Sequence, residues 1–270
     1  MIIQEKVLKI GFFYKKGALD AGDALNTAGG FYGEVNGENV FRLGNDFRKV
    51  EGAGGARDAE KLSGLEISAP SRPTKIVAVG LNYLRHTEEM NFKLPETPLL
   101  FLKPSSSILP SRGSIIYPSS SSRVDYEAEL GIVIKKTAKN VTEQEAAGYI
   151  LGYTAFNDVT ARDLQSLDGQ WTRAKGFDTF SPYGPFIETE LKPGNLRIQA
   201  ILNGAVRQDS STADMIFGVF KLVSFISSVM TLYPGDVIAS GTPGGIGEMK
   251  RGDQIIIRIE GLDDLVNKVA

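Results

Sequence analysis

The sequence contains no cysteine, and among its 270 residues there is one histidine, His86. The missing cysteines exclude disulfides, thiolate metal sites and cysteine nucleophiles. A single histidine excludes a zinc site built from two or three histidines of one chain. Hard oxygen ligands therefore remain for any metal ion.

An excess of charge of either sign is also missing. The 30 basic and 32 acidic residues give a formal net charge of -2 and are mixed along the chain, so no field favours nucleic acid or an anionic membrane surface. No stretch approaches the length of a transmembrane helix. The N-terminus lacks the small-residue cleavage pattern of a signal peptide. These absences predict a cytoplasmic protein whose partner is a small molecule.

The residues that are present predict a mainly β protein. With 42% hydrophobic residues the chain can bury a full core. Glycine-rich pieces and the hairpin signal Asn36-Gly37 predict a small β-rich N-terminal domain over residues 1–70. Pro70 and Pro73 stiffen the chain as a boundary would. The catalytic domain is then residues 71–270.

The patterning of this second domain favours strands. We expect buried strands at 76–79 and 149–157, alternating strands at 124–134, 196–202 and 254–260, and a hairpin at Asn203-Gly204. The Pro/Ser-rich passage 103–122 reads as an ordered loop, because apolar residues punctuate it. Only two helices are expected after it, over about 142–148 and 214–232.

Acidic residues follow the strand alternation between Val124 and Ile134. Asp125, Glu127 and Glu129 stand at alternate positions, so their side chains share one strand face. Such positions lie roughly 6.6 Å apart, a gap that two glutamates can close around one cation. A solvated outer sheet face explains the same pattern about equally well.

A further carboxylate, Asp158, ends the apolar strand predicted at 149–157. A charge at the end of a buried strand needs a partner. Asp158 therefore favours a metal site over a solvated sheet face.

From about Lys75 to its C-terminus the chain resembles the fumarylacetoacetate hydrolase family, in its acylpyruvase and hydroxymuconate isomerase-like branch. The resemblance rests on five separated motifs: VGLNY at 79–83 with His86 and Glu89, DYEAEL at 125–130, NDVTARD at 157–163, KGFDTF at 175–180 with Gly184-Pro185, and SGTPGGIG at 240–247. Each motif is weak alone, and together they are specific.

The resemblance implies an α+β, predominantly β fold, a mixed β-sandwich or roll. It also implies a homodimer or larger assembly. At the positions of Glu127, Glu129 and Asp158 it implies ligands of Mg²⁺, with Mn²⁺ or Ca²⁺ as alternatives.

The chemistry that such a site would support starts from the pyruvoyl group. Three carboxylates on an octahedral Mg²⁺ leave about three positions for water and for the carboxylate and 2-oxo oxygens of a substrate. The ion would stabilise the enolate that forms when the bond beyond C3 breaks, and Lys175 would add positive charge. His86 and Glu89 would face one side of a helical turn as a base and its orienting carboxylate. An ordinary surface histidine and lysine are the alternatives.

Substrate-binding candidates come from the first motif and the last third of the chain. The loop 241–247 lacks the features of a P-loop or a dinucleotide fingerprint, and we expect its Thr242 hydroxyl and backbone amides to approach a substrate carboxylate. Arg207 suits a distal carboxylate and Gln208 stands beside it, although exposed hairpin polarity explains both almost as well. Tyr83 is a further candidate.

Four other residues have expected supporting roles. We expect Arg162 and Asp163 to pair behind Asp158 and fix its position. Trp171 and Tyr183 are more typical of packing than of recognition.

The leading prediction of function is hydrolysis of a C–C bond in an acylpyruvate or a related 2,4-dioxo acid. Isomerisation of a 2-hydroxyhepta-2,4-diene-1,7-dioate (5-carboxymethyl-2-hydroxymuconate) type acid, decarboxylation of oxaloacetate and dehydration of a 2-oxo-3-deoxy sugar acid share the enolate and stay open. A non-catalytic module that binds 2-oxo acids belongs to another class. The presence of His86, Glu89 and Lys175 argues against that module.

Overall fold

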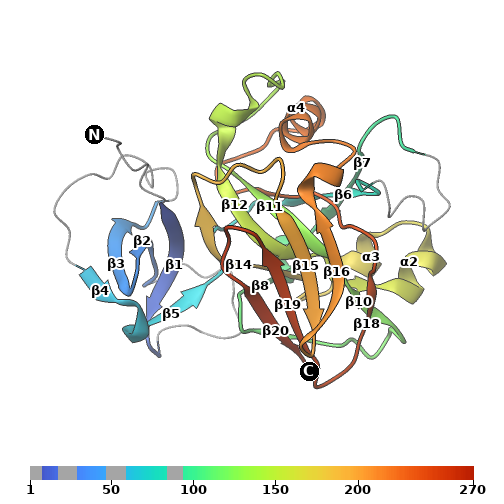
Figure 1. The fold of residues 1–270 in the computed structure, drawn as a ribbon, viewed down its shortest axis with the longest axis horizontal. Helices are drawn as coiled ribbons and strands as arrows, with labels where there is room; N and C mark the ends of the chain where they lie inside the picture. Colours follow the sequence, from blue (N-terminus) through green and yellow to red (C-terminus); the bar gives the residue numbers. More distant parts are fainter. Residues whose placement is uncertain (1–7, 18–28, 47–58, 84–93) are drawn as a thin grey trace.

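Strands dominate the structure, a computed structural model that describes residues 8–17, 29–46, 59–83 and 94–270 (Figure 1). The described strands form three sheets of twelve, five and three strands. Helices are few and short. The prediction of an α+β, predominantly β fold is therefore confirmed.

The largest sheet runs through the whole molecule. Its strands follow the order β4 (Ala59–Lys61), β3 (Asn39–Gly44), β2 (Phe31–Asn36), β1 (Lys9–Lys15), β14 (Ser181–Glu188), β12 (Ile150–Asn157), β11 (Ala128–Ile134), β17 (Val237–Ala239), β6 (Ile76–Gly80) and β7 (Leu99–Lys103). Two more strands join it, β5 (Leu65–Ser68) on β1 and β8 (Ile108–Leu109) on β14. The strands predicted at 76–79 and 149–157 are confirmed as β6 and β12.

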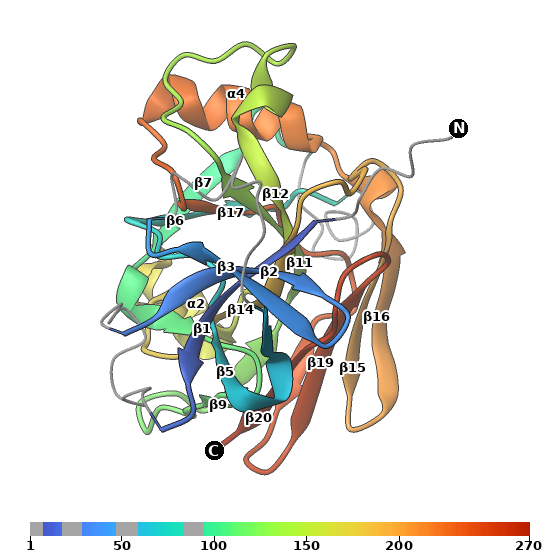
Figure 2. The same ribbon diagram turned by 90° about the vertical axis from the view of Figure 1, so that its left-hand side faces the viewer.

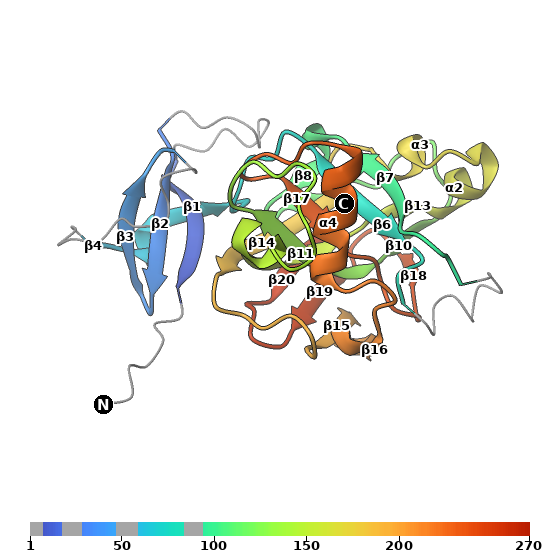
Figure 3. The ribbon, with the colours of Figure 1, turned by 90° about the horizontal axis from the view of Figure 1, so that it is seen from above.

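The N-terminal strands form one end of this sheet, opposite the end that carries the short helices near residues 162–175 (Figures 1 and 3). They enclose a small aromatic and aliphatic core that includes Phe13 and Phe31. Pairing of Ile10 with Ile187 joins them to β14. An N-terminal unit with its own core thus shares its sheet with the main body, and the boundary at residue 70 stays a prediction.

Both predicted hairpins form. In the first, Asn36 pairs with Asn39, so the loop is Gly37-Glu38, one residue later than the Asn-Gly signal indicates, and Gly37 takes the positive φ of 58°. In the second, Leu202 pairs with Ala205 around Asn203-Gly204, and both loop residues have positive φ, as a type I′ turn requires.

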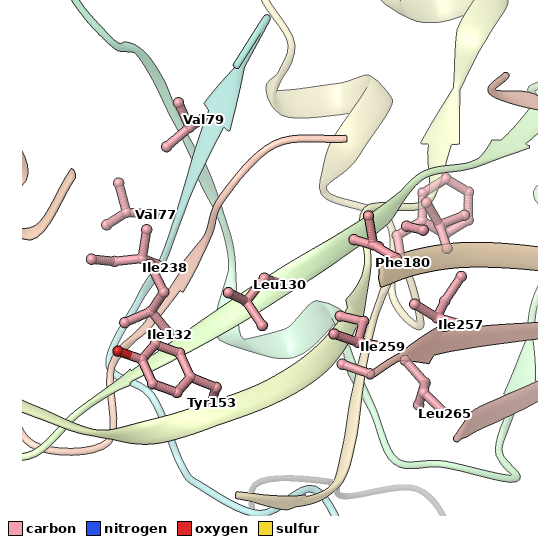
Figure 4. Close-up of a cluster of buried hydrophobic side chains, with 14 of the residues drawn as sticks. Val77, Val79, Leu130, Ile132, Tyr153, Phe180, Ile238, Ile257, Ile259 and Leu265 are labelled. Carbon is pink, nitrogen blue, oxygen red and sulfur yellow. The ribbon is translucent and has the colours of Figure 1, made fainter. Parts of the chain in front are cut away.

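The five-stranded sheet packs against the face of β11, β12 and β14, which makes the sandwich (Figure 2). Its strands are β16 (Ala205–Ser211), β15 (Arg197–Leu202), β19 (Gln254–Ile259), β20 (Leu265–Val269) and β9 (Ser114–Ile115). Side chains of the two sheets meet in the main core, which contains Leu130 and Ile132 of one sheet and Ile257 and Ile259 of the other (Figure 4). The alternating strands predicted at 196–202 and 254–260 are confirmed.

The third sheet is small and lies beside the carboxylate-rich segment. It contains β13 (Thr160–Ala161), β10 (Val124–Tyr126) and β18 (Gly247–Met249). The ordered loop predicted at 103–122 is also confirmed, because it includes η3 (Ser105–Ser107), β8 and β9.

The helices depart most from expectation. Helix α4 (Val219–Val229) lies inside the predicted range 214–232, after η5 (Thr212–Asp214). The helix predicted at 142–148 is wrong, since only the 3₁₀ turn η4 (Ala146–Tyr149) forms there; η2 (Leu62–Gly64) is another such turn. Helices α2 (Arg162–Asp168) and α3 (Thr172–Lys175) were not predicted, because both are too short to show a helical period. Within the described ranges, no helix combines the length and the apolar character that crossing a membrane requires.

Candidate metal centre

A break in one predicted strand creates the site. The alternating segment 124–134 forms two strands, β10 and β11, and Glu127 lies between them. The Glu127 amide donates to Asn157 Oδ1 at 3.0 Å, and the Asp158 amide donates to the Glu127 carbonyl at 2.9 Å. These two bonds hold Asp158, at the end of β12, beside Glu127.

Three carboxylates gather at this break. Glu127, Glu129 and Asp158 are 5%, 1% and 1% exposed, and each offers an oxygen within 4.8 Å of an oxygen of the other two. Asp125 is also buried, but Arg123 and Arg162 bind it outside this group. The alternative interpretation of the alternating acidic residues, a solvated outer sheet face, is therefore wrong.

Lys175 bridges two of the three carboxylates. Its Nζ donates to Glu127 Oε2 at 2.9 Å and to Asp158 Oδ2 at 2.6 Å. Burial lowers the pKa of Lys175, but the charges of Asp158 and Glu127 outweigh burial and raise it above its ordinary value. The ammonium group therefore stays charged inside the site.

Two further cations lie beside the three carboxylates. The sequence analysis did not predict Lys103 at the site, and it paired Arg162 with Asp163. Lys103, at the end of β7, donates to Asp158 Oδ1 and, at 3.2 Å, to the Val159 carbonyl. Arg162 donates to Glu127 Oε1 and, at 2.9 Å, to Asp125 Oδ2. The signal for Lys103 is slight, a lysine that directly follows four apolar residues and precedes a proline.

The expected pair of Arg162 and Asp163 does not form, and this prediction is wrong. Arg162 points to Asp125 and Glu127. Asp163 accepts hydrogen bonds from Ser121 and Ser122. Asp163 lies in the first turn of α2. Because this helix is short, the sequence does not show which side of it each residue faces.

Glu127 and Glu129 differ in charge environment. Burial raises the pKa of Glu127, but Lys175 and Arg162 outweigh it and lower that pKa to about 2. Burial, and then the negative charges of Asp158 and Glu127, raise the pKa of Glu129 well above its ordinary value. Among the described residues, only the Gly241 amide donates to Glu129, at 2.9 Å. Glu129 is a buried carboxyl group without a cation of its own.

This arrangement fits a divalent cation. All three candidate ligands are hard oxygen donors, the class that Mg²⁺, Mn²⁺ and Ca²⁺ prefer. A carboxylate has about four acceptor sites, and the hydrogen bonds to Glu127, Asp158 and Glu129 leave each of them at least one. A cation would also balance the charge of Glu129.

The three carboxylates open onto a pocket of about 280 Å³. One part of its wall is polar and the other is apolar. The lining residues are Val79, Gly80, Leu81, Leu99, Phe101, Glu127, Glu129, Asp158, Arg162, Gln165, Ser166, Trp171, Lys175 and Thr242. Gln165 and Ser166 were not predicted to line the pocket, because they lie on α2, a helix that was itself not predicted.

The predicted substrate-binding residues are dispersed. Thr242 lines the pocket. Gln208 is buried behind it and donates to Thr242 Oγ1 and the Pro243 carbonyl, both at 2.8 Å, while its Oε1 accepts from the Ala128 amide. Arg207 is exposed and does not line the pocket. The structure thus places Gln208 as a support of the loop and leaves Arg207 apart.

Three other predicted residues lie deeper or outside the described chain. Tyr83 is buried beside the site rather than lining it, and burial, then the charges of Glu129 and Asp214, raise its pKa. His86 and Glu89 lie outside the described residues. Their predicted role as base and orienting carboxylate stays a prediction.

The structure also changes the expected roles of the Gly241 amide and of Trp171. The Gly241 amide binds Glu129, so this amide positions a candidate metal ligand rather than a substrate carboxylate. Tyr183 packs in the core, as expected, with its hydroxyl donating to the Ser71 carbonyl. Trp171 packs edge-on against Phe101 at 5.1 Å between ring centroids, but it also lines the pocket.

Known proteins with solved structures share this fold. The chain is similar to the solved 2-hydroxyhepta-2,4-diene-1,7-dioate isomerase from Mycobacterium marinum, with 36% sequence identity and a TM-score of 0.86; the match covers 97% of this chain and 98% of that one. It is also similar to the fumarylpyruvate hydrolase from Pseudomonas aeruginosa, solved with Mn²⁺ and pyruvate, with 32% sequence identity and a TM-score of 0.70; this match covers 75% of this chain and 91% of that one.

A curated relative and a family model complete the comparison. The mitochondrial oxaloacetate tautomerase Fahd2a of Rattus norvegicus is 41% identical over 210 residues, which are 74% of this chain and 67% of that protein. The model of the fumarylacetoacetate (FAA) hydrolase C-terminal domain matches residues 75–270, a span that holds all three carboxylates and Lys175. The chain belongs to the fumarylacetoacetate hydrolase family.

Proposed function

We propose that the chain is a divalent-metal-dependent enzyme that hydrolyses a C–C bond in a small 2,4-dioxo acid of the acylpyruvate type. The observation that carries this proposal is the group of three buried carboxylates with the Lys175 ammonium across two of them, at the wall of a pocket. The solved relative from Pseudomonas aeruginosa is a fumarylpyruvate hydrolase, and its name supports this substrate class.

Glu127, Glu129 and Asp158 would hold the cation, which we propose to be Mg²⁺. Mn²⁺, present in the solved relative from Pseudomonas aeruginosa, would serve in its place. When bound, the ion would supply a Lewis acid for the carboxylate and 2-oxo oxygens of the substrate.

The charges around the site favour an anionic substrate. Four buried carboxylates face four cations: Asp125, Glu127, Glu129 and Asp158 against Lys103, Arg123, Arg162 and Lys175. Lys103 and Arg162, which the sequence analysis did not place at the site, supply two of these positive charges. Since these formal charges cancel, a divalent cation would leave positive charge for a carboxylate and for charge that develops on the 2-oxo oxygen.

We propose separate roles in the reaction for Lys175, for Thr242, and for His86 with Glu89. Lys175, protonated and buried, would stabilise negative charge on the pyruvate enolate as it leaves. The Thr242 hydroxyl, which accepts from Gln208, keeps its own proton for a substrate oxygen. His86, oriented by Glu89, is the proposed base that activates water for attack on the distal carbonyl. The products are pyruvate and a carboxylic acid.

A second candidate is keto–enol tautomerisation or double-bond isomerisation of a 2-oxo acid. Among the described pocket-lining residues, each side-chain carboxylate belongs to the candidate metal centre. These residues therefore offer enolate stabilisation but no separate base for water. The names of the rat and Mycobacterium marinum relatives favour the same chemistry.

One experiment separates the two reactions. Loss of the enol absorbance of acetylpyruvate is followed with Mg²⁺, with chelator, and in Glu127→Ala and His86→Gln, while enol–keto exchange of oxaloacetate is followed in parallel. We expect acetylpyruvate cleavage that chelator and Glu127→Ala abolish, and that His86→Gln lowers. The exposed Glu143→Gln is the matched control and should keep full activity. Exchange of oxaloacetate without cleavage of acetylpyruvate would replace the hydrolase by the tautomerase.

We also propose that the chain forms a homodimer and acts in the cytoplasm. Exposed Leu99 and Leu102 on the edge strand β7, at 43% and 47%, support a subunit contact. Sedimentation equilibrium would show twice the chain mass if the dimer forms.

A further inference from the structure

The pocket beside the carboxylates has a second, chemically different wall. Five of its lining side chains or segments are apolar: Val79, Leu81, Leu99, Phe101 and Trp171. The two cations that line the pocket, Arg162 and Lys175, are both bound to carboxylates. The described part of this wall therefore offers carbon and indole surface, without a free positive charge.

Helix α3 places an aromatic ring next to the reactive end of the pocket. Trp171 precedes its first turn, and the Lys175 amide donates to the Trp171 carbonyl at 2.9 Å. Residues four apart lie on one side of a helical turn, and both side chains line the pocket. The same turn thus presents an ammonium group to the carboxylates and an indole to the apolar wall.

Two neighbours fix the position of the indole. Phe101 lies close to both the indole and the ammonium group, because its ring centroid is 5.1 Å from that of Trp171 and 5.2 Å from Lys175 Nζ. Gly80 leaves room for the indole, since a Cβ at this position would lie 2.7 Å from the ring. The indole is therefore held as part of the wall and is only partly buried.

We propose that Trp171, with Phe101 and Gly80, determines specificity by accepting an uncharged, flat, apolar substituent at the end of the substrate remote from its 2-oxo carboxylate. This inference rests on the proposed binding of 2-oxo acids at the carboxylate end. An apolar group gains from burial against Phe101 and Trp171. A carboxylate in the same place would lose hydration without a described cation to receive it.

The test uses two stable 2-oxo acids that differ at the remote end, 2-oxo-4-phenylbutanoate and 2-oxoglutarate, with pyruvate as the common core. Binding of each to the full chain with Mg²⁺ is measured by calorimetry, so the result does not depend on which reaction the enzyme catalyses. We expect the phenyl acid to bind at least about tenfold more tightly than 2-oxoglutarate, the discrimination that an apolar pocket commonly gives.

Variants assign the preference to the indole. Trp171→Ala should bring the two affinities to within about threefold of each other and leave pyruvate affinity unchanged, whereas Trp171→Phe should keep most of the preference. Gly80→Ala, which pushes the indole aside, tests the same point if Trp171→Ala does not fold. The exposed Phe220→Ala on α4 is the matched aromatic control and should behave as wild type.

The outcomes separate this inference from the function on which it rests. Equal affinity for the two acids, tighter binding of 2-oxoglutarate, or an unchanged preference in Trp171→Ala would overturn the role of Trp171 while pyruvate still binds. If none of the three acids binds in the presence of Mg²⁺, the proposed function itself fails.

Discussion

Two buried carboxylates, Asp236 and Glu129, show opposite ways to place a negative charge inside this protein. Asp236 accepts from the Thr74 amide and hydroxyl and from the Lys75 amide through one oxygen, and from Lys75 Nζ and the Tyr233 amide through the other. Its acceptor sites are filled by its own chain. Asp236 is therefore a structural residue.

Glu129 has one described donor, the Gly241 amide, and faces two other carboxylates. This one donor does not offset the cost of burying its charge. The comparison teaches that burial alone does not identify a functional carboxylate, whereas burial with few donors next to other buried carboxylates does. The predictions below test this difference, from the largest expected effect to the smallest.

Replacing Lys103 by Met should give the largest change in stability. Asp158 would keep only Lys175, which it shares with Glu127, so we expect the free energy of unfolding in chelator to fall by about 3 kcal/mol. Mg²⁺ should restore most of this loss, because the cation would replace the missing positive charge. Denaturant unfolding with chelator and with Mg²⁺ measures both values. A loss that Mg²⁺ leaves unchanged would contradict cation binding at Asp158.

Replacing Lys175 by Met should affect catalysis more than metal binding. We expect kcat to fall by about 10²–10³, the usual loss when one preorganised charge is removed from a reacting centre. Steady-state kinetics with acetylpyruvate, beside Mn²⁺ binding by the same variant, checks this. Wild-type kcat in the variant would show that Lys175 only balances charge.

Asp236→Ala should lower stability without touching the site. Removal of the carboxylate leaves the Thr74 and Tyr233 amides and Lys75 Nζ without their acceptor, at a cost of about 2–3 kcal/mol. We expect the same loss with chelator and with Mg²⁺, in contrast to Lys103→Met. Thermal unfolding under both conditions makes the comparison. Rescue by Mg²⁺ here would remove the distinction between structural and ligand carboxylates.

Glu188 gives the smallest effect and a dependence on pH. Burial raises its pKa to about 7, Lys9 lowers it in part, and Asp263 adds to the rise; among the described residues its Oε1 has no hydrogen-bond partner. Because this pKa is higher in the folded state, the stabilisation is complete below the ordinary carboxyl pKa and is lost as the pH rises through about 7.

The substitution Glu188→Gln should remove that dependence. At about pH 8 we expect the variant to be more stable than wild type by about 1–2 kcal/mol, and at about pH 5 to match it. Denaturant unfolding across this range is the measurement. Parallel pH profiles of stability for the two proteins would show that Glu188 does not titrate as described.

Much of the candidate centre could be predicted from sequence because its ligands leave local signals. Glu127 and Glu129 stand out in a strand alternation, and Asp158 stands out as a charge after an apolar strand. The break of that strand at Glu127 leaves no such signal, since it arises from pairing with separate partners, β13 and β12.

The supporting residues could not be predicted for a related reason. Lys103 looks like any lysine at the end of a strand until β7 brings it next to Asp158. Arg162 lies at the start of α2, a helix of 7 residues that is too short to show which side faces the site. Their roles depend on contacts between segments far apart in sequence, which local patterns do not record.

The central claim is that Glu127, Glu129 and Asp158 bind one divalent cation. Titration of the chain with Mn²⁺, followed by electron paramagnetic resonance, tests it most directly in wild type, Glu129→Gln and Asp236→Ala. We predict one Mn²⁺ per wild-type chain, a loss of at least about 100-fold in affinity in Glu129→Gln, and wild-type affinity in Asp236→Ala. Wild-type affinity in Glu129→Gln, or no bound Mn²⁺ in wild type, would contradict the account.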